Sequence, residues 1–344
     1  MVALPCFHLI RRTNPGSKIT LLTNLPVLEK AAPAIAILEN SGLCDDAIHY
    51  PVATRKLSEL TQVRQKIREL RPDLFVNLAA GRGLLKSLRD VLFFRSCGIK
   101  RMVGTPLRNR DLRVQQMKES QYEPESLRLV SRLSALGEVD LADRQFWQLR
   151  ITGNERDQAA DLLPSRQSQF IAVSVGTKVH AKDWGEENWF SLLTLLSEAM
   201  PDVTLILLGS PDEWDRSEKM SRAWAGNCAN LCGKTPPRIS AAVLERCGLF
   251  IGHDSGPAHL AGVVGVPTLA LFSWHNPPGQ WFPGHRSWKS VKVLYPPLPK
   301  GGWTSELQMK RSVSEGILLL QPGLVLKSAL ELWQRRHESQ SARN

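Results

Sequence analysis

The sequence predicts an α/β protein made of two doubly wound domains. Its 344 residues are enough for two domains of ordinary size, and 42% of them are hydrophobic, so each half can bury a core. In both halves, short apolar runs that suit buried strands alternate with longer amphipathic runs that suit helices. Such alternation is typical of a parallel sheet with right-handed crossovers.

The first half begins with a helical pattern at residues 2–12, which ends before Asn14-Pro15-Gly16. Strands are predicted at residues 18–23, 47–52, 73–79 and 100–103, and further helices at residues 27–40, 57–70, 84–97 and 123–136. The helix at 57–70 has the clearest pattern, because apolar residues recur there at steps of three or four. Residues 107–121 are polar and basic without a clear period, which predicts a loop.

One turn of the first half is a candidate binding element. Gly81-Arg82-Gly83 follows the strand at 73–79, and ligands of open α/β sheets bind beyond the carboxyl ends of the strands. Arg82 is therefore a candidate for contact with an anionic acceptor, although a solvated arginine on a surface turn explains the pattern as well.

The second half repeats the alternation. Strands are predicted at residues 170–175, 203–208, 249–253 and 268–272, a short strand followed by a turn at residues 230–235, and helices at residues 187–200, 239–247, 258–264 and 324–336. Residues 276–302, rich in Pro, Gly and Trp, are predicted as a loop, either near a ligand or on the surface. We place an N-terminal domain at 1–150, a C-terminal domain at 165–323, and a final helix with a frayed tail at 324–344.

Polar turns follow four strands of the second half. They contain Gly176-Thr177, Gly209-Ser210, Gly233-Lys234 and Asp254-Ser255-Gly256. Since the carboxyl ends of parallel strands lie at one edge of a sheet, the four turns should converge there. That convergence favours a nucleotide site.

The fourth turn opens the most informative stretch of the chain. Ser255 or Asp254 suits the N-cap of the helix that follows, and Pro257 suits its first turn. Free amides and the positive end of the helix dipole would then point into a crevice, which suits a phosphate or diphosphate. An ordinary capped turn is the simpler interpretation, but His253, Asp254, Ser255 and His259 make this turn unusually polar.

From Asp254 to Phe272 the sequence reads D-S-G-P-x-H-L-A-G-x-x-G-V-P-T-x-x-L-F. This pattern resembles the signature of glycosyltransferase family 9, the lipopolysaccharide heptosyltransferases. The resemblance implies the two-domain GT-B architecture, in which a cleft separates two Rossmann-like domains. It also implies that the Asp-Ser-Gly turn holds a nucleotide-sugar donor, and it covers the second half of the chain better than the first.

Donor-binding roles follow as hypotheses. The amides of Ser255 and Gly256 would hold the diphosphate, with a hydroxyl from Thr177. Lys182 or Lys178 would supply positive charge to the leaving diphosphate, and Lys182 is preferred because Lys182-Asp183-Trp184 resembles the family's Lys-x-Trp.

Acidic and imidazole groups complete the predicted donor site. Asp212 or Glu213 would accept hydrogen bonds from the ribose hydroxyls. Asp254 is awkward beside a diphosphate and suits a helix cap or the sugar hydroxyls better. His259 is either a phosphate donor or a packed core histidine.

The resemblance implies an inverting, metal-independent reaction. The sequence offers no persuasive Asp-x-Asp metal site, and we predict no metal and no cofactor, the nucleotide-sugar being a substrate. Family members begin with a strand and a Gly-Asp turn whose Asp is the expected general base. Neither that strand nor that turn has a counterpart in this sequence, so no residue is assigned as the base.

Charge and cysteine content narrow the partners. The net charge of +11 suggests anionic partners, but no basic run carries interleaved aromatic residues, so a nucleic-acid groove is not expected. The six cysteines form no C-x-x-C pair, and no apolar run approaches the length of a membrane helix. We expect a cytoplasmic protein, with peripheral contact at the inner membrane face left open.

These observations lead to one main functional hypothesis. The chain would transfer a heptose or a related sugar from a nucleotide-sugar such as ADP-heptose to a lipopolysaccharide core or another anionic glycan or glycolipid. Two alternatives remain open at this stage: another sugar-nucleotide enzyme, such as an epimerase, and a non-catalytic nucleotide-sugar-binding protein.

Overall fold

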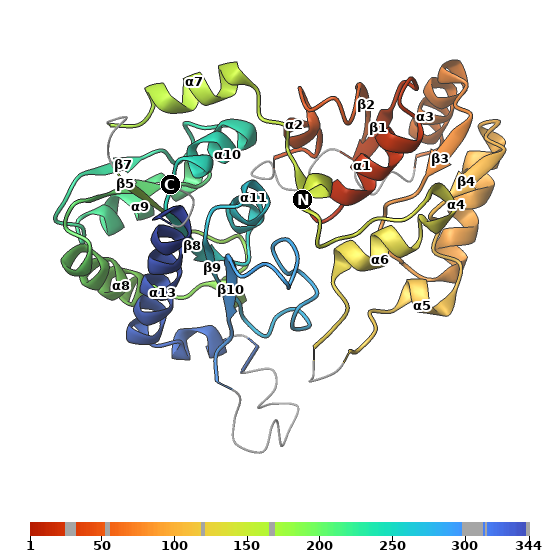
Figure 1. Ribbon diagram of the computed structural model, residues 1–344. Coiled ribbons are helices and arrows are strands. Elements are labelled where there is room, and N and C mark those ends of the chain that lie inside the picture. The colour runs from red at the N-terminus through yellow and green to blue at the C-terminus, as the bar shows by residue number, and fades with distance from the viewer. Residues whose placement is uncertain are drawn as a thin grey trace. The chain divides into compact units, whose positions relative to one another are not determined.

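The computed structural model describes residues 1–24, 32–51, 56–117, 121–164, 169–297, 312–313 and 315–341. The chain folds as two compact units (Figure 1). The N-terminal unit comprises Val2–Arg150 and Pro278–Gln280, and the C-terminal unit comprises Ile151–Pro277 and Trp281–Asn344, together with Met1.

The C-terminal unit is built on a six-stranded parallel sheet. Its strands are β5 (Gln169–Ser174), β6 (Val203–Leu207), β7 (Cys228–Asn230), β8 (Leu249–His253), β9 (Thr268–Leu271) and β10 (Val291–Leu294). They lie in the order β7-β6-β5-β8-β9-β10. The chain thus runs outward from β5 in one direction, returns to β8 beside β5, and then runs outward in the other direction. This is the doubly wound order, with its switch point between β5 and β8.

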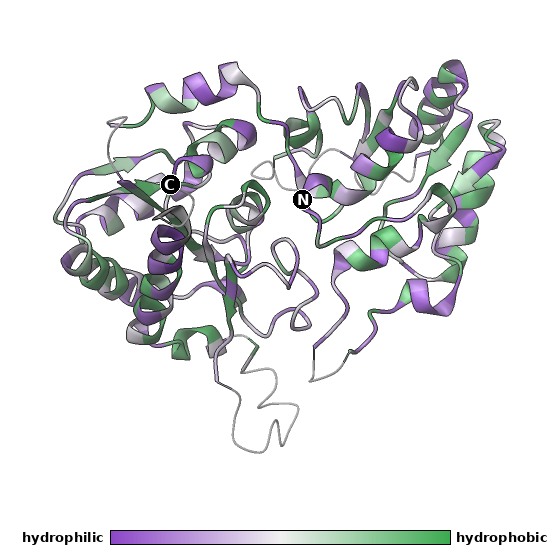
Figure 2. Cartoon of the chain, viewed as in Figure 1, coloured by the Kyte–Doolittle hydropathy of each residue, from purple (hydrophilic) through white to green (hydrophobic). Residues whose placement is uncertain are grey.

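Helices cover both faces of this sheet. α8 (Glu186–Ala199) packs against α9 (Trp214–Ser221) and α13 (Pro322–Ser341), whereas α10 (Pro237–Glu245) packs against α7 (Gly153–Asp161) and α11 (Gly256–Val264). Right-handed crossovers place these two groups on opposite faces. Figure 2 shows the strands between them as mostly hydrophobic, because a sheet covered on both faces needs apolar side chains in both directions.

Two strands of this sheet differ from the sequence prediction. β10 lies inside 276–302, which we predicted as a loop, and residues 298–302 of that region lie outside the described part of the chain. β7 ends at Asn230, where the predicted strand begins. Both are short edge strands whose pairing with β9 and β6 defines them, so local composition identifies them poorly.

The N-terminal unit holds two pairs of parallel strands. β1 (Thr20–Asn24) pairs with β2 (Asp46–Tyr50), and β3 (Leu74–Val76) pairs with β4 (Arg101–Val103). Within the residues described, these pairs are separate two-stranded sheets. The strand predicted at 73–79 is shorter in the structure, where it is β3, residues 74–76.

The helices of this unit follow the predicted alternation, except that a short helix, α5 (Asn109–Leu112), lies within residues 107–121, which we predicted as a loop. They are α1 (Leu4–Thr13), α2 (Ile35–Leu38), α3 (Leu57–Leu70), α4 (Leu84–Ser96), α5 (Asn109–Leu112) and α6 (Glu125–Ser131). The helix predicted at 27–40 begins on residues 27–31, which lie outside the described part, and the described remainder forms only the short α2. α3 has the predicted bounds and buries Val63 and Ile67 against Cys97 and Ile99.

A short segment from late in the sequence belongs to the N-terminal unit. The Tyr122 amide donates to the Pro278 carbonyl at 2.8 Å, and the Glu125 amide donates to the Gln280 carbonyl, also at 2.8 Å. Glu125 is the first residue of α6, so Gln280 satisfies an amide that the helix itself leaves unpaired. Pro278–Gln280 therefore serves as a backbone cap of α6.

Two ion pairs join α7 to α10 in the C-terminal unit, and they differ in burial. Arg238 Nε lies 2.5 Å from Glu155 Oε1, and both side chains are buried. Arg156 Nε lies 2.7 Å from Glu245 Oε2, and the Arg156 side chain is 53% exposed. The two pairs therefore offer a matched comparison of a buried and an exposed contact between the same helices.

Arg238→Met should lower the free energy of unfolding of the C-terminal unit by about 3–5 kcal/mol, because Glu155 would keep a buried charge without its partner. Arg156→Met should cost no more than about 1 kcal/mol, because its pair is largely exposed. Urea denaturation followed by tryptophan fluorescence measures both, since eight of the nine tryptophans that the structure describes lie in this unit. Equal losses of unfolding free energy in the two variants would contradict the conclusion that the buried ion pair stabilises the unit more than the exposed one.

Acid should weaken the buried pair. The hydrogen bond from Arg238 holds the pKa of Glu155 at about 2, below its ordinary value of 4.5. Since the folded-state pKa is the lower one, the contribution is complete above pH 4.5 and is lost as the pH falls toward 2. The difference in unfolding free energy between the wild type and Arg238→Met should narrow over that window.

Candidate functional site

The predicted donor residues lie at the switch point of the six-stranded sheet. β5 and β8 are neighbours there, with Ser174 paired to Gly252, so the turns that follow both strands emerge side by side. The first turn carries Gly176 and Thr177, and the second carries Asp254, Ser255 and Gly256. Crevices at such points are where open α/β sheets bind ligands. All of these residues belong to the C-terminal unit.

The N-terminus of α11 lacks the side-chain cap that we predicted. Ser255 occupies the N-cap position in an extended conformation, but its side chain makes no capping hydrogen bond, and its hydroxyl donates to the His253 carbonyl at 3.3 Å. The Asp254 carboxylate is engaged by Lys182. Ser255 is therefore the N-cap residue, as predicted, but the expected hydrogen bond from its side chain or from Asp254 to the first-turn amides is absent, and these amides remain available to a ligand.

Open space lies above the first residue of α11. Gly256 is exposed, and a Cβ atom built on it would meet no atom within 4 Å. The protein therefore does not require glycine here for its own packing. A glycine in this place lets a bound group approach the backbone closely.

An ion pair with little solvent exposure involves Asp254, which lies directly before this helix. Lys182 Nζ is 2.6 Å from Asp254 Oδ2, and the side chains are only 13% and 7% exposed. His259 Nε2 lies 3.8 Å from Asp254 Oδ1 on the other side. Burial by itself raises the pKa of Asp254, but the nearby His259 imidazole and the charge of Lys182 outweigh it and lower that pKa below its ordinary value. The carboxylate is therefore charged at neutral pH.

Asn276 is a further partner that we did not predict. Its side-chain amide donates to Asp254 Oδ2 at 3.1 Å. It lies in the region that sequence analysis described only as a loop near a ligand or on the surface. Nothing in the local sequence links it to Asp254, because the contact joins residues from different loops.

His253 connects three segments of the site. The Trp184 amide donates to its Nε2 at 3.0 Å, the Trp189 indole lies 3.4 Å from the same nitrogen, and Nδ1 lies 3.1 Å from the Gly176 carbonyl. Two N–H donors point at Nε2, so Nε2 is the acceptor and Nδ1 carries the proton. Complete burial lowers the pKa of His253 to about 4, so the ring is neutral at physiological pH.

A second ion pair holds the segment that carries Lys182. Asp183 accepts two hydrogen bonds from Arg216 of α9, both at 2.7 Å. Next along the chain, the Trp184 indole donates to the Leu320 carbonyl at 2.9 Å. Contacts on both sides therefore fix the position of Lys182.

The other predicted donor residues lie around the same strand ends. The Thr177 hydroxyl accepts from the Val179 amide at 3.4 Å, and Lys178 is exposed. Glu213 accepts from the Ser210 amide at 2.8 Å, and its carboxyl group covers Gly176 and Gly209, where added Cβ atoms would collide with it. Asp212 is exposed. Of the two acidic candidates, Glu213 is thus the one that lies against the strand ends.

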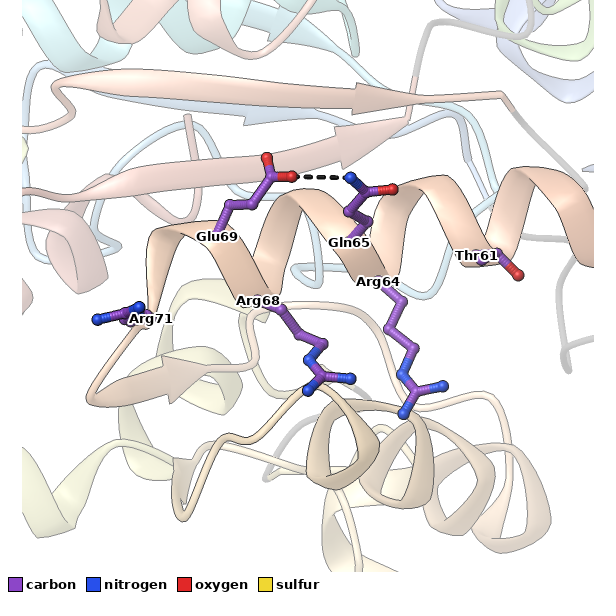
Figure 3. Close-up of a pocket in the computed structure, with 6 residues that line it drawn as sticks. All are labelled: Thr61, Arg64, Gln65, Arg68, Glu69 and Arg71. Carbon is purple, nitrogen blue, oxygen red and sulfur yellow. Dashed lines mark hydrogen bonds between the residues drawn. The ribbon is translucent and has the colours of Figure 1, made fainter.

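Arg82 belongs to the N-terminal unit. It forms an ion pair with Asp90 of α4 at 3.0 Å and lines a small pocket with Asn77, Ser87 and Pro106, among others. A wider hollow of about 550 Å³ runs along α3 (Figure 3). The hollow belongs to the N-terminal unit and is lined by residues of α3 and its C-cap, namely Thr61, Arg64, Gln65, Arg68, Glu69 and Arg71, none of which is a predicted donor residue.

The described residues contain no cluster of three or more His, Cys, Asp or Glu side chains suited to a metal ion. All six cysteines are free thiols. Across the part of the chain that the structure covers, no helix has the length and apolar character needed to span a membrane.

Comparison with known proteins gives one family. The model of glycosyltransferase family 9 (heptosyltransferase) matches residues 63–308. Lipopolysaccharide heptosyltransferase 1 of Pseudomonas aeruginosa is 28% identical over 242 residues, which make up 65% of this chain and 61% of that protein. The matched part thus spans less than two thirds of that relative.

Solved structures show the same fold. A glycosyltransferase family 9 structure from Veillonella parvula has a TM-score of 0.71 and 19% identity, over 97% of this chain and 93% of that one. The Escherichia coli heptosyltransferase WaaC with ADP-2-deoxy-2-fluoro heptose has a TM-score of 0.60 and 16% identity, over 96% and 94%. The fold is therefore GT-B, as the sequence predicted. Since the family model covers well over half of its residues, this chain belongs to glycosyltransferase family 9.

Proposed function

We propose that this chain is a glycosyltransferase that moves a heptose or a related sugar from a nucleotide-sugar to a lipopolysaccharide core or another glycan or glycolipid. Membership of glycosyltransferase family 9 supports this activity. The observation that carries the proposal is the start of α11, which lacks a side-chain cap and lies next to the Lys182–Asp254 pair at the switch point of the sheet.

An ADP-linked sugar is the proposed donor. A solved heptosyltransferase of the same fold holds ADP-2-deoxy-2-fluoro heptose. In this chain, the amides of Ser255 and Gly256 would donate to the diphosphate, and the helix dipole would favour its negative charge. The open space above Gly256 is where that group would lie.

Lys182 would promote departure of the nucleotide. When the bond between the sugar and the diphosphate breaks, the bonding electrons stay on the phosphate oxygen, which gains negative charge. An ammonium group has three N–H donors, and the contacts of Lys182 with the carboxylate and the carbonyl oxygen of Asp254 leave one donor for that phosphate oxygen. With this charge and the helix N-terminus in place, direct displacement with inversion can proceed without a divalent metal.

Asp254 would act chiefly by orienting Lys182. Its carboxylate is held by Lys182, Asn276 and His259, so one oxygen lone pair or more remains for a sugar hydroxyl. The Thr177 hydroxyl would add a contact to the diphosphate, and Glu213 would accept from the ribose. Arg82 would contact an anionic acceptor, and we place the reaction at the inner face of the cytoplasmic membrane.

Transfer can be tested with the purified full chain, ADP-heptose and a lipopolysaccharide core that lacks heptose. We expect ADP release that depends on both substrates, together with an increase in the mass of the core. Saturable donor binding without turnover would instead identify a nucleotide-sugar-binding protein. A change in the donor sugar without any acceptor would identify an epimerase.

Lys182→Met and Asp254→Asn should each lower kcat/KM for the donor at least about tenfold, or ~1.4 kcal/mol of transition-state stabilisation. Lys178→Met, four positions away on an exposed residue, is the matched control and should change it little. Steady-state kinetics measure all three, and tryptophan fluorescence checks that each variant is folded. A larger loss in Lys178→Met would transfer the role to that lysine.

Gly256→Ala tests whether a ligand occupies the space at the start of α11. The added methyl group meets no protein atom within 4 Å, so the melting temperature should stay within a few degrees while donor affinity falls at least about tenfold. Gly153→Ala is the matched control, because Gly153 is also the first residue of a helix and its Cβ position is also open. Unchanged donor affinity in Gly256→Ala, measured by calorimetry with ADP, would place the diphosphate elsewhere.

A further inference from the structure

One helix of the N-terminal unit exposes a stripe of leucines. Leu85, Leu88 and Leu92 of α4 are 83%, 43% and 71% exposed. Their spacing of three and four residues places them on one face of the helix. Single exposed leucines are ordinary, but three in one row form a contiguous apolar surface.

The opposite face of α4 packs against the rest of the N-terminal unit. Ser87 is the buried residue of this helix, and the Phe94 ring stacks on Phe75 of β3 with centroids 3.8 Å apart. In Figure 2 the α4 ribbon is mostly hydrophobic with hydrophilic positions between. The outer leucines therefore add nothing to the core of this unit. A helix that is apolar on both faces normally has a second apolar partner.

Basic residues border the stripe. Lys86, Arg89 and Arg95 are exposed on α4, and its one acidic residue, Asp90, is paired with Arg82 and Arg89. The helix itself thus carries a net charge of +2, from three cations and one carboxylate.

The neighbouring helix α3 extends this basic border. Arg64 of α3 donates from Nε to the carbonyl of Ser96, the last residue of α4, at 3.1 Å. Figure 3 shows Arg64 and Arg68 projecting from the same side of α3. Arginines from two helices therefore lie near one end of the leucine stripe.

We propose that the outer face of α4 docks this chain on the surface of an anionic phospholipid bilayer. Leucines on a helix that lies in the plane of the interface enter the boundary between headgroups and acyl chains, while flanking Lys and Arg contact lipid phosphates. A second copy of the chain fits less well, because self-association through this face would bring like charges together. The inference deepens the proposed function, since a lipid-linked acceptor lies in such a surface, and docking can be measured without sugar transfer.

The test uses the full chain and sedimentation with two kinds of vesicle, phosphatidylcholine alone and phosphatidylcholine with phosphatidylglycerol. We expect binding to the anionic vesicles that weakens at high salt. The variant L85S/L88S/L92S should bind them at least about tenfold more weakly, because it loses the apolar anchor. Arg89→Glu with Arg95→Glu should abolish the preference for phosphatidylglycerol.

Matched controls come from the C-terminal unit. Leu319→Ser with Leu324→Ser removes two leucines that are also exposed, and Lys289→Glu with Lys327→Glu reverses two exposed charges. Both controls should bind vesicles like the wild type. Equal vesicle binding by the wild type and the α4 variants would overturn the inference. So would a wild-type dimer that the leucine variant dissociates without vesicles, because a second copy would then cover the stripe.

Transfer to a soluble, delipidated acceptor separates this inference from the proposed function. The leucine variant should keep that activity while it loses vesicle binding. Vesicle binding without any transfer would refute the proposed function and leave the docking surface in place. Transfer without vesicle binding by the wild type would refute the docking surface alone.

Discussion

A neutral, fully buried imidazole holds the candidate donor site together. His253 ends β8, and its two nitrogens join the turn after β5 to the segment that begins α8. This arrangement works for one protonation state and one tautomer. A proton on Nε2 would point at the Trp184 amide, which is itself a donor, and a buried donor without an acceptor is costly. The position of Lys182, two residues before Trp184, depends on this constraint.

The charged groups of the site lie on the segments that His253 holds together. A carboxylate beside the proposed diphosphate site is unfavourable by itself, but Asp254 is compensated by a lysine at 2.6 Å and approached by an imidazole. The pair is held at low exposure by Asn276 and by the Asp183–Arg216 contact on the adjacent residue. Low exposure strengthens electrostatic interactions, so the single ammonium of Lys182 could act strongly on the leaving phosphate of the proposed reaction.

Local patterns in the sequence predict the central strands of the six-stranded sheet. The central strands, β5, β6, β8 and β9, are buried on both faces. Their continuous apolar runs in the sequence therefore predicted them as strands. The polar residues that follow these strands in the sequence predicted the candidate site. The edge strand β10 was missed, because pairing with β9 defines it more than its own composition does.

The sequence did not predict which side chains contact one another. The Ser255 or Asp254 cap was a fair expectation from residue type, but the Lys182 ammonium competes for the Asp254 carboxylate across 72 positions of sequence. Asn276 and Arg216 reach the site in the same way, from other loops and helices. Competition of this kind is settled by tertiary structure, and no spacing rule predicts it.

The cap that Pro278–Gln280 places on α6 has a consequence for building chimeras within this family. A swap of the two halves at a single junction after Arg150 would separate the Tyr122 and Glu125 amides from their native acceptors. A hybrid that keeps both hydrogen bonds within one parent protein therefore needs two crossover points. The tripeptide must travel with the N-terminal half, although it is encoded far downstream.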